Sequence, residues 1–78
     1  FIIKFLIYND HLYIITNTNR LEEISFEGDL IKEFDREKIV YQIMGHRGML
    51  YIFAADEIIK SPLDFNNISI VVTYSQEY

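Results

Sequence analysis

The residues of this 78-residue chain that could do chemistry are two histidines, four serines and scattered carboxylates. His11 follows Asp10 at an expected turn, and His46 stands beside Arg47 between two glycines. A metal centre needs several histidines or carboxylates that converge at ligand spacing. The sequence contains neither His-x-His nor His-Glu-x-x-His, and it has no cysteine for thiolate ligation or disulfides. We therefore expect no metal site and no cofactor.

Catalytic motifs are also missing from the sequence. A nucleophilic serine needs a base beside it in an exposed elbow, and Gly-x-Ser-x-Gly does not occur. The adjacent carboxylates of Glu22 and Glu23 would point to opposite faces of a strand, which separates them as an acid–base pair. The segment Gly45–Gly48 is too short for a phosphate-binding loop and lacks its lysine. These absences indicate that the chain is not an enzyme.

The charge balance limits the class of partner. The chain carries 12 acidic and seven basic residues, for a net charge of −5. Nucleic-acid binding relies on clustered lysine and arginine, and here the basic residues are scattered, which argues against nucleic acid and against an anionic membrane surface. The apolar start at 1–8 is far shorter than the roughly 20 residues of a membrane-spanning helix. We expect a protein partner with a basic surface.

The elements that must position these residues are short strands. Half of the residues are apolar, mostly β-formers, and no helical period extends over a useful length. We expect an all-β antiparallel meander of about eight short strands, separated by turn signals such as Asn9-Asp10 and Gly28-Asp29. The segment 55–60 fits either a helix or a turn followed by a short strand. The expected strands are 2–7, 12–16, 21–26, 30–34, 39–44, 49–54 and 68–74. The tyrosines expected to pack in the core with their hydroxyls at its rim are Tyr8, Tyr13, Tyr41, Tyr51 and Tyr74.

The chain nearly repeats itself with an offset of 38 residues. Leu12-Tyr13-Ile14-Ile15 returns as Leu50-Tyr51-Ile52-Phe53, and the polarity pattern of 2–6 returns at 40–44. This period is close to that of propeller blades. It predicts a first blade-like unit at 1–35, a charged linker at 36–38 and a second unit at 39–78.

The segment 12–30 resembles one blade of a β-propeller, particularly of the NHL type. It shows apolar-Tyr-apolar, a polar turn that ends in Arg20, an apolar strand and a turn at Gly28. The second copy lacks an arginine and a glycine equivalent to Arg20 and Gly28, and it places Pro62 in mid-blade. The resemblance implies two four-stranded blades, whereas about four to eight are needed to close a propeller. The other blades would come from further chain or from copies of this one. A small β-barrel or sandwich is the alternative fold.

These observations favour a non-enzymatic protein–protein interaction or scaffold module, part of a larger propeller or of an assembly of blades. We expect its partner surface to be formed by three turns at one edge, 9–11, 17–20 and 45–48. The candidate binding residues are Asp10, His11, Asn17, Asn19, Arg20, His46 and Arg47. The alternative is a small acidic stand-alone inhibitor or immunity-type protein that blocks an enzyme. A carbohydrate binder built from assembled blades is a third hypothesis.

Overall fold

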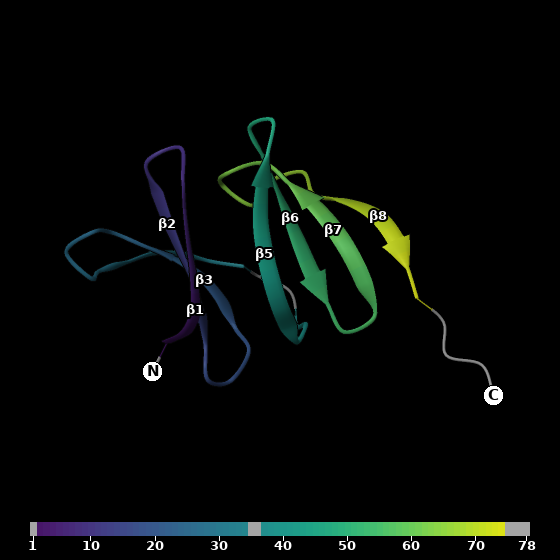
Figure 1. Cartoon of the computed structure of the whole chain (residues 1–78), viewed down its shortest axis with the longest axis horizontal. Helices are drawn as coiled ribbons and strands as arrows, with labels where there is room; N and C mark the ends of the chain where they lie inside the picture. Colours follow the sequence, from purple (N-terminus) through teal and green to yellow (C-terminus); the bar gives the residue numbers. More distant parts are fainter. Residues whose placement is uncertain (1, 35–36, 75–78) are drawn as a thin grey trace.

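The chain folds into two four-stranded antiparallel sheets that lie side by side (Figure 1). The computed structural model describes residues 2–34 and 37–74. In each sheet the strands follow one another in chain order. The N-sheet consists of β1 (Ile2–Tyr8), β2 (His11–Thr16), β3 (Leu21–Ile24) and β4 (Leu30–Glu33). The C-sheet consists of β5 (Val40–His46), β6 (Met49–Ala54), β7 (Glu57–Ser61) and β8 (Ser69–Thr73). The predicted all-β meander is confirmed.

Several strand ends differ from the sequence-based expectation. Strand β5 continues to His46, so the turn that follows is only Arg47-Gly48. Both turn residues have positive φ, 51° and 79°, which is the backbone twist that suits a two-residue hairpin. The ambiguous segment 55–60 contains most of strand β7 and not a helix. The predicted linker at 36–38 lies partly outside the described residues.

The first two strands of each sheet pair in the same register. Phe5 pairs with Ile14, and Ile43 pairs with Ile52, so both partners differ by 38 residues. A bulge near the start of β1 returns near the start of β5. From the third strand on, the offset between equivalent residues is 37. Residues 16–20 lie between Ile15 and its partner Leu21, whereas only residues 54–57 lie between Phe53 and its partner Ile58.

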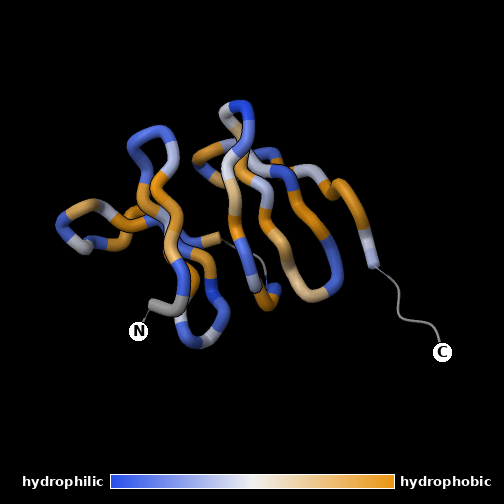
Figure 2. The backbone as a smooth tube through the Cα atoms, viewed as in Figure 1, coloured by the Kyte–Doolittle hydropathy of each residue, from blue (hydrophilic) through white to orange (hydrophobic). Residues whose placement is uncertain are grey.

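The hydrophobic core lies between the two sheets. Apolar residues run along the strands, and polar ones gather at most turns (Figure 2). One face of the N-sheet, which we call its inner face, packs against one face of the C-sheet, and Phe65 from the β7–β8 segment joins them. The core residues are Tyr13, Ile15, Leu21, Phe34, Val40, Ile43, Leu50, Ile52, Ile59 and Phe65. Each sheet therefore buries one face and turns the other outward.

Candidate functional site

The three turns that were expected to form one binding surface do not lie together. The β1–β2 turn and the β5–β6 turn are at the same end of the sheets, at the top of Figure 1. The turn at 17–20 follows β2 and lies at its other end, at the bottom of the figure. The prediction of a single edge is wrong, because a strand of a meander carries one turn at each end. Asn17 and Arg20 are thus exposed on a different side of the molecule from Asp10 and Arg47.

The upper edge is held together by a contact between the two sheets. The Tyr8 hydroxyl accepts a hydrogen bond from the backbone N–H of Gly48 at 2.6 Å. The Tyr8 ring lies so close to Gly45 that a Cβ there would be 2.3 Å from it. Asp10 and Arg47 are exposed beside this contact, and both have positive φ. The contact fixes the relative position of the two turns that carry these charges.

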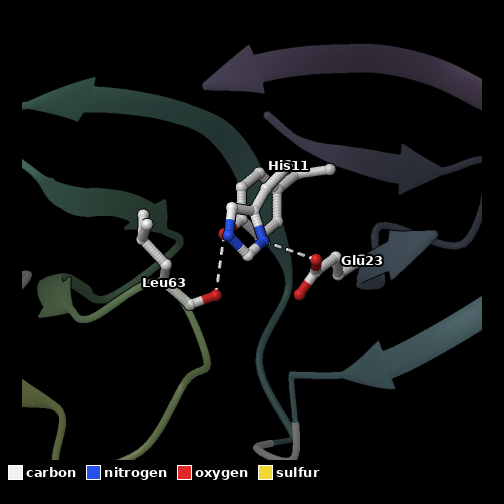
Figure 3. A network of polar contacts seen from close by, with 4 residues as sticks. His11, Glu23 and Leu63 are labelled. Atoms are coloured by element: carbon white, nitrogen blue, oxygen red, sulfur yellow. Dashed lines mark hydrogen bonds and ion pairs between the residues drawn. The ribbon is translucent and has the colours of Figure 1, made fainter. Parts of the chain in front are cut away.

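His11 belongs to a polar network between the sheets. Its Nδ1 lies 2.6 Å from Oε2 of Glu23, a residue only 6% exposed, and its ring stacks on that of Tyr13 (Figure 3). The Tyr13 hydroxyl donates to the carbonyl oxygen of Leu63 at 2.7 Å. Burial raises the pKa of Tyr13 above its ordinary value, and the carboxylates of Glu23 and Asp64 raise it further. Tyr13 therefore stays protonated and donates, and His11 supplies the partner that a buried carboxylate needs.

Asn19 also connects the sheets. Its backbone carbonyl accepts a hydrogen bond from the N–H of Val40 at 3.0 Å. Its side-chain Nδ2 donates to the carbonyl oxygen of Val40 at 3.1 Å. Asn19 adopts φ 61°, which asparagine tolerates better than most residues. This arrangement gives Asn19 a structural role at the junction, while the side chain of Arg20 points to solvent at the same turn.

A hollow lies on the outward face of the C-sheet. It has a volume of about 290 Å³ and is lined by Met44, His46, Tyr51 and Phe53. The edge of one ring faces the other in the pair His46–Tyr51, whose centroids are 6.2 Å apart. Of the seven residues selected from the sequence, only His46 lines this hollow.

The hollow is the centre of a wider apolar surface, because residues paired across strands share a face. Phe53 pairs with Ile58, which in turn pairs with Val72. Tyr51 pairs with Lys60, which adds a positive charge at the border of the surface. We call this surface the open C-face: Met44, His46, Tyr51, Phe53, Ile58, Lys60 and Val72.

Tyrosines were expected to pack in the core, and the structure corrects this in part. Tyr13 is fully buried, but Tyr41 and Tyr74 are about half exposed, and Tyr51 lines the hollow on the open C-face. The signal that could have located the hollow is the alternation in 49–54, in which Tyr51 and Phe53 share one face and Leu50 and Ile52 the other. That pattern shows two apolar faces, one of which the core leaves uncovered.

The chemistry of the open C-face suits an apolar protein surface. Its lining is aromatic and aliphatic, with the imidazole of His46 and the ammonium of Lys60 as polar groups. Among residues 2–34 and 37–74, no three histidine or acidic side chains come close enough to hold a metal ion. The described part of the chain also contains no helix long and apolar enough to cross a membrane.

Comparisons of the chain with protein-family models, curated proteins and solved structures give no match. The resemblance of 12–30 to a propeller blade thus stays a prediction, and so do the seven binding residues chosen from the sequence.

Proposed function

We propose that this chain is a non-enzymatic protein-binding and scaffold module whose working surface is the open C-face. One observation carries this proposal: the open C-face occupies the positions that form the buried inner face of the N-sheet. Tyr51 and Phe53 stand at the register positions of Tyr13 and Ile15, which are 0% exposed. Met44 stands likewise at the position of Leu6.

The equivalence has an energetic consequence. In the N-sheet these positions are covered by the C-sheet, and their burial contributes to the core. In the C-sheet the same kind of apolar surface faces solvent, with Met44 at 44% exposure. Covering apolar surface yields about 25 cal/mol for each Å² removed from water. A sheet face of this kind is a favourable docking surface for another protein surface.

The arrangement of the sheets supports the blade interpretation. Two four-stranded meanders follow each other, with matching registers and matching bulges. Their inner faces pack on one another as successive units of an array do. In this proposal each sheet is one propeller-like blade, and the open C-face is the place where a following surface docks.

Site-specific photo-cross-linking in cells that express the chain tests this function. The photoreactive residue p-benzoylphenylalanine replaces Phe53 on the open C-face or, in the control, Asn17 in the exposed β2–β3 turn. We expect discrete covalent adducts with protein from position 53 and none from position 17. Adducts from position 17 alone, or a diffuse smear from both positions, would contradict the proposal.

A further inference from the structure

We propose that the open C-face of one chain packs against the outward face of the N-sheet of a second copy, so that chains assemble head to tail. This inference rests on the proposed function and names the partner of the same surface. The interface inside one chain provides the template for the interface between two chains.

The second half of the interface is the outward face of the N-sheet. Two rows of cross-strand partners form it, one through Phe5 and one through Ile7. We call it the open N-face: Phe5, Ile7, Leu12, Ile14, Glu22, Ile24 and Glu33. Within it Ile14 is only 6% exposed, and Leu12, Glu22 and Ile24 are half-buried. Phe5 and Ile7 are 68% and 55% exposed. The equivalent rows of the C-sheet run through Ile43 and Gly45 and pack on the N-sheet inside the chain.

The contact between copies differs at one point from the contact inside the chain. Inside the chain, the ring of Tyr8 lies directly on Gly45. The register gives His46 as the equivalent of Tyr8 and Ile7 as the equivalent of Gly45. In the contact between copies, a smaller ring therefore meets a larger aliphatic side chain.

The segment that connects the last two strands contains a phenylalanine in both sheets. Phe65, between β7 and β8, packs on Tyr13 and Phe34 with ring centroids 5.7 and 5.4 Å apart. Phe26 lies in the corresponding segment between β3 and β4 and is 62% exposed. That segment extends away from the C-sheet, in the direction in which the β7–β8 segment extends over the N-sheet (Figure 1). Phe26 is thus placed to reach Tyr51 of the preceding copy.

The charges favour head-to-tail contact over contact between identical faces. The open C-face carries Lys60, and the open N-face carries Glu22 and Glu33. Two C-faces would bring lysines together, and two N-faces would bring glutamates together, which is unfavourable in an interface. A contact between unlike faces is heterologous, and it forms a ring where the rotation from one copy to the next closes. About four to eight blades close a propeller, so about two to four copies would complete one.

The first part of the test is the mass of the purified chain in solution, measured by native mass spectrometry and light scattering from low concentration to the solubility limit. We expect one closed oligomer of fixed copy number. A monomer at every concentration would overturn the inference. If position 53 still gave adducts with a different protein in cells, the proposed function would stand and only the identity of the partner would be wrong.

The second part locates the contact by charge reversal. Lys60→Glu and Glu22→Lys each place like charges across the interface, and we expect each to weaken assembly about tenfold or more. A mixture of the two variants should restore the contact between copies, because the altered C-face of one variant meets the altered N-face of the other. A ring of two or four copies, in which the variants alternate, should form completely, and a ring of three should keep one unfavourable contact. The matched control Glu37→Lys, in the exposed segment before β5, should assemble like the unaltered chain. Variants that assemble alone as well as in the mixture would overturn the proposed faces.

Discussion

The inner face of the N-sheet and the open face of the C-sheet are built from equivalent positions but have opposite environments. Tyr13 and Ile15 are completely buried, whereas Tyr51 and Phe53 are half-buried and line an open hollow. The local sequences are nearly the same, so the difference arises from the neighbour of each sheet and not from its own residues. The comparison shows that the C-sheet carries an apolar face of the kind that is buried in the N-sheet, but no sheet of the same chain covers it.

The largest expected effect is a difference in stability between substitutions on the two faces. Ile15→Ala leaves a cavity in the core and should lower the free energy of unfolding by about 2–5 kcal/mol. Phe53→Ala, at the equivalent position, should lower it by less than about 1.5 kcal/mol. Urea denaturation of both variants at low concentration in a Lys60→Glu background, where assembly is weakened, measures the difference. Equal losses would show that the C-face is not open.

The Tyr8–Gly45 contact has no equivalent of the same shape on the open faces. Gly45→Ala places a Cβ against the Tyr8 ring, and we expect a loss of about 1–3 kcal/mol of unfolding free energy. In a Tyr8→Leu background the same substitution should cost much less, because the ring is gone. A double-mutant cycle by urea denaturation measures the coupling. Independent, additive losses would contradict the close approach.

The two histidines allow a second comparison between a buried site and the open C-face. His11→Ala removes the partner of the buried Glu23 carboxylate and should destabilise the fold by about 1–3 kcal/mol. His46→Ala, on the open C-face, should change the free energy of unfolding by less than about 0.5 kcal/mol in the Lys60→Glu background. Thermal unfolding of both variants measures these changes in stability. A larger loss of stability for His46→Ala than for His11→Ala would contradict the assignment of buried and open faces.

The smallest expected effect distinguishes two tyrosines. Tyr13→Phe removes the hydrogen bond to Leu63 and should cost about 0.5–1.5 kcal/mol, whereas Tyr51→Phe should cost less. The raised pKa of Tyr13 adds a pH dependence. Above pH of about 10, the unfolded chain loses this proton and the folded chain keeps it, so stability should fall as pH rises. Urea denaturation at neutral and alkaline pH measures both effects, and Tyr13→Phe should remove this part of the alkaline loss. An identical alkaline loss in the variant would contradict the role of Tyr13.

Much of the fold can be predicted from the alternation of apolar residues and from the turn signals. The strands around 12–16 and 49–54 and the hairpin at Asn9-Asp10 follow from these patterns. The position of the 17–20 turn could also have been predicted, because successive turns of a meander alternate between ends. The extension of β5 to His46 depended on Arg47 accepting a left-handed backbone, which local sequence does not specify.

The candidate site was harder to predict for a physical reason. The residues around Tyr13 and Tyr51 are nearly the same, and only the three-dimensional arrangement decides which face is covered. The pairing of His11 with Glu23 also depends on the β2–β3 register, which brings residues 12 positions apart into contact. Sequence patterns therefore identified the units, and the packing of the sheets identified the open faces.

The measurement that tests this account most directly is the native mass of the unaltered chain in solution across a wide range of concentrations. The account predicts a single closed assembly of a few copies, since each chain presents two complementary open faces. A folded chain that remains a monomer up to its solubility limit would contradict head-to-tail assembly.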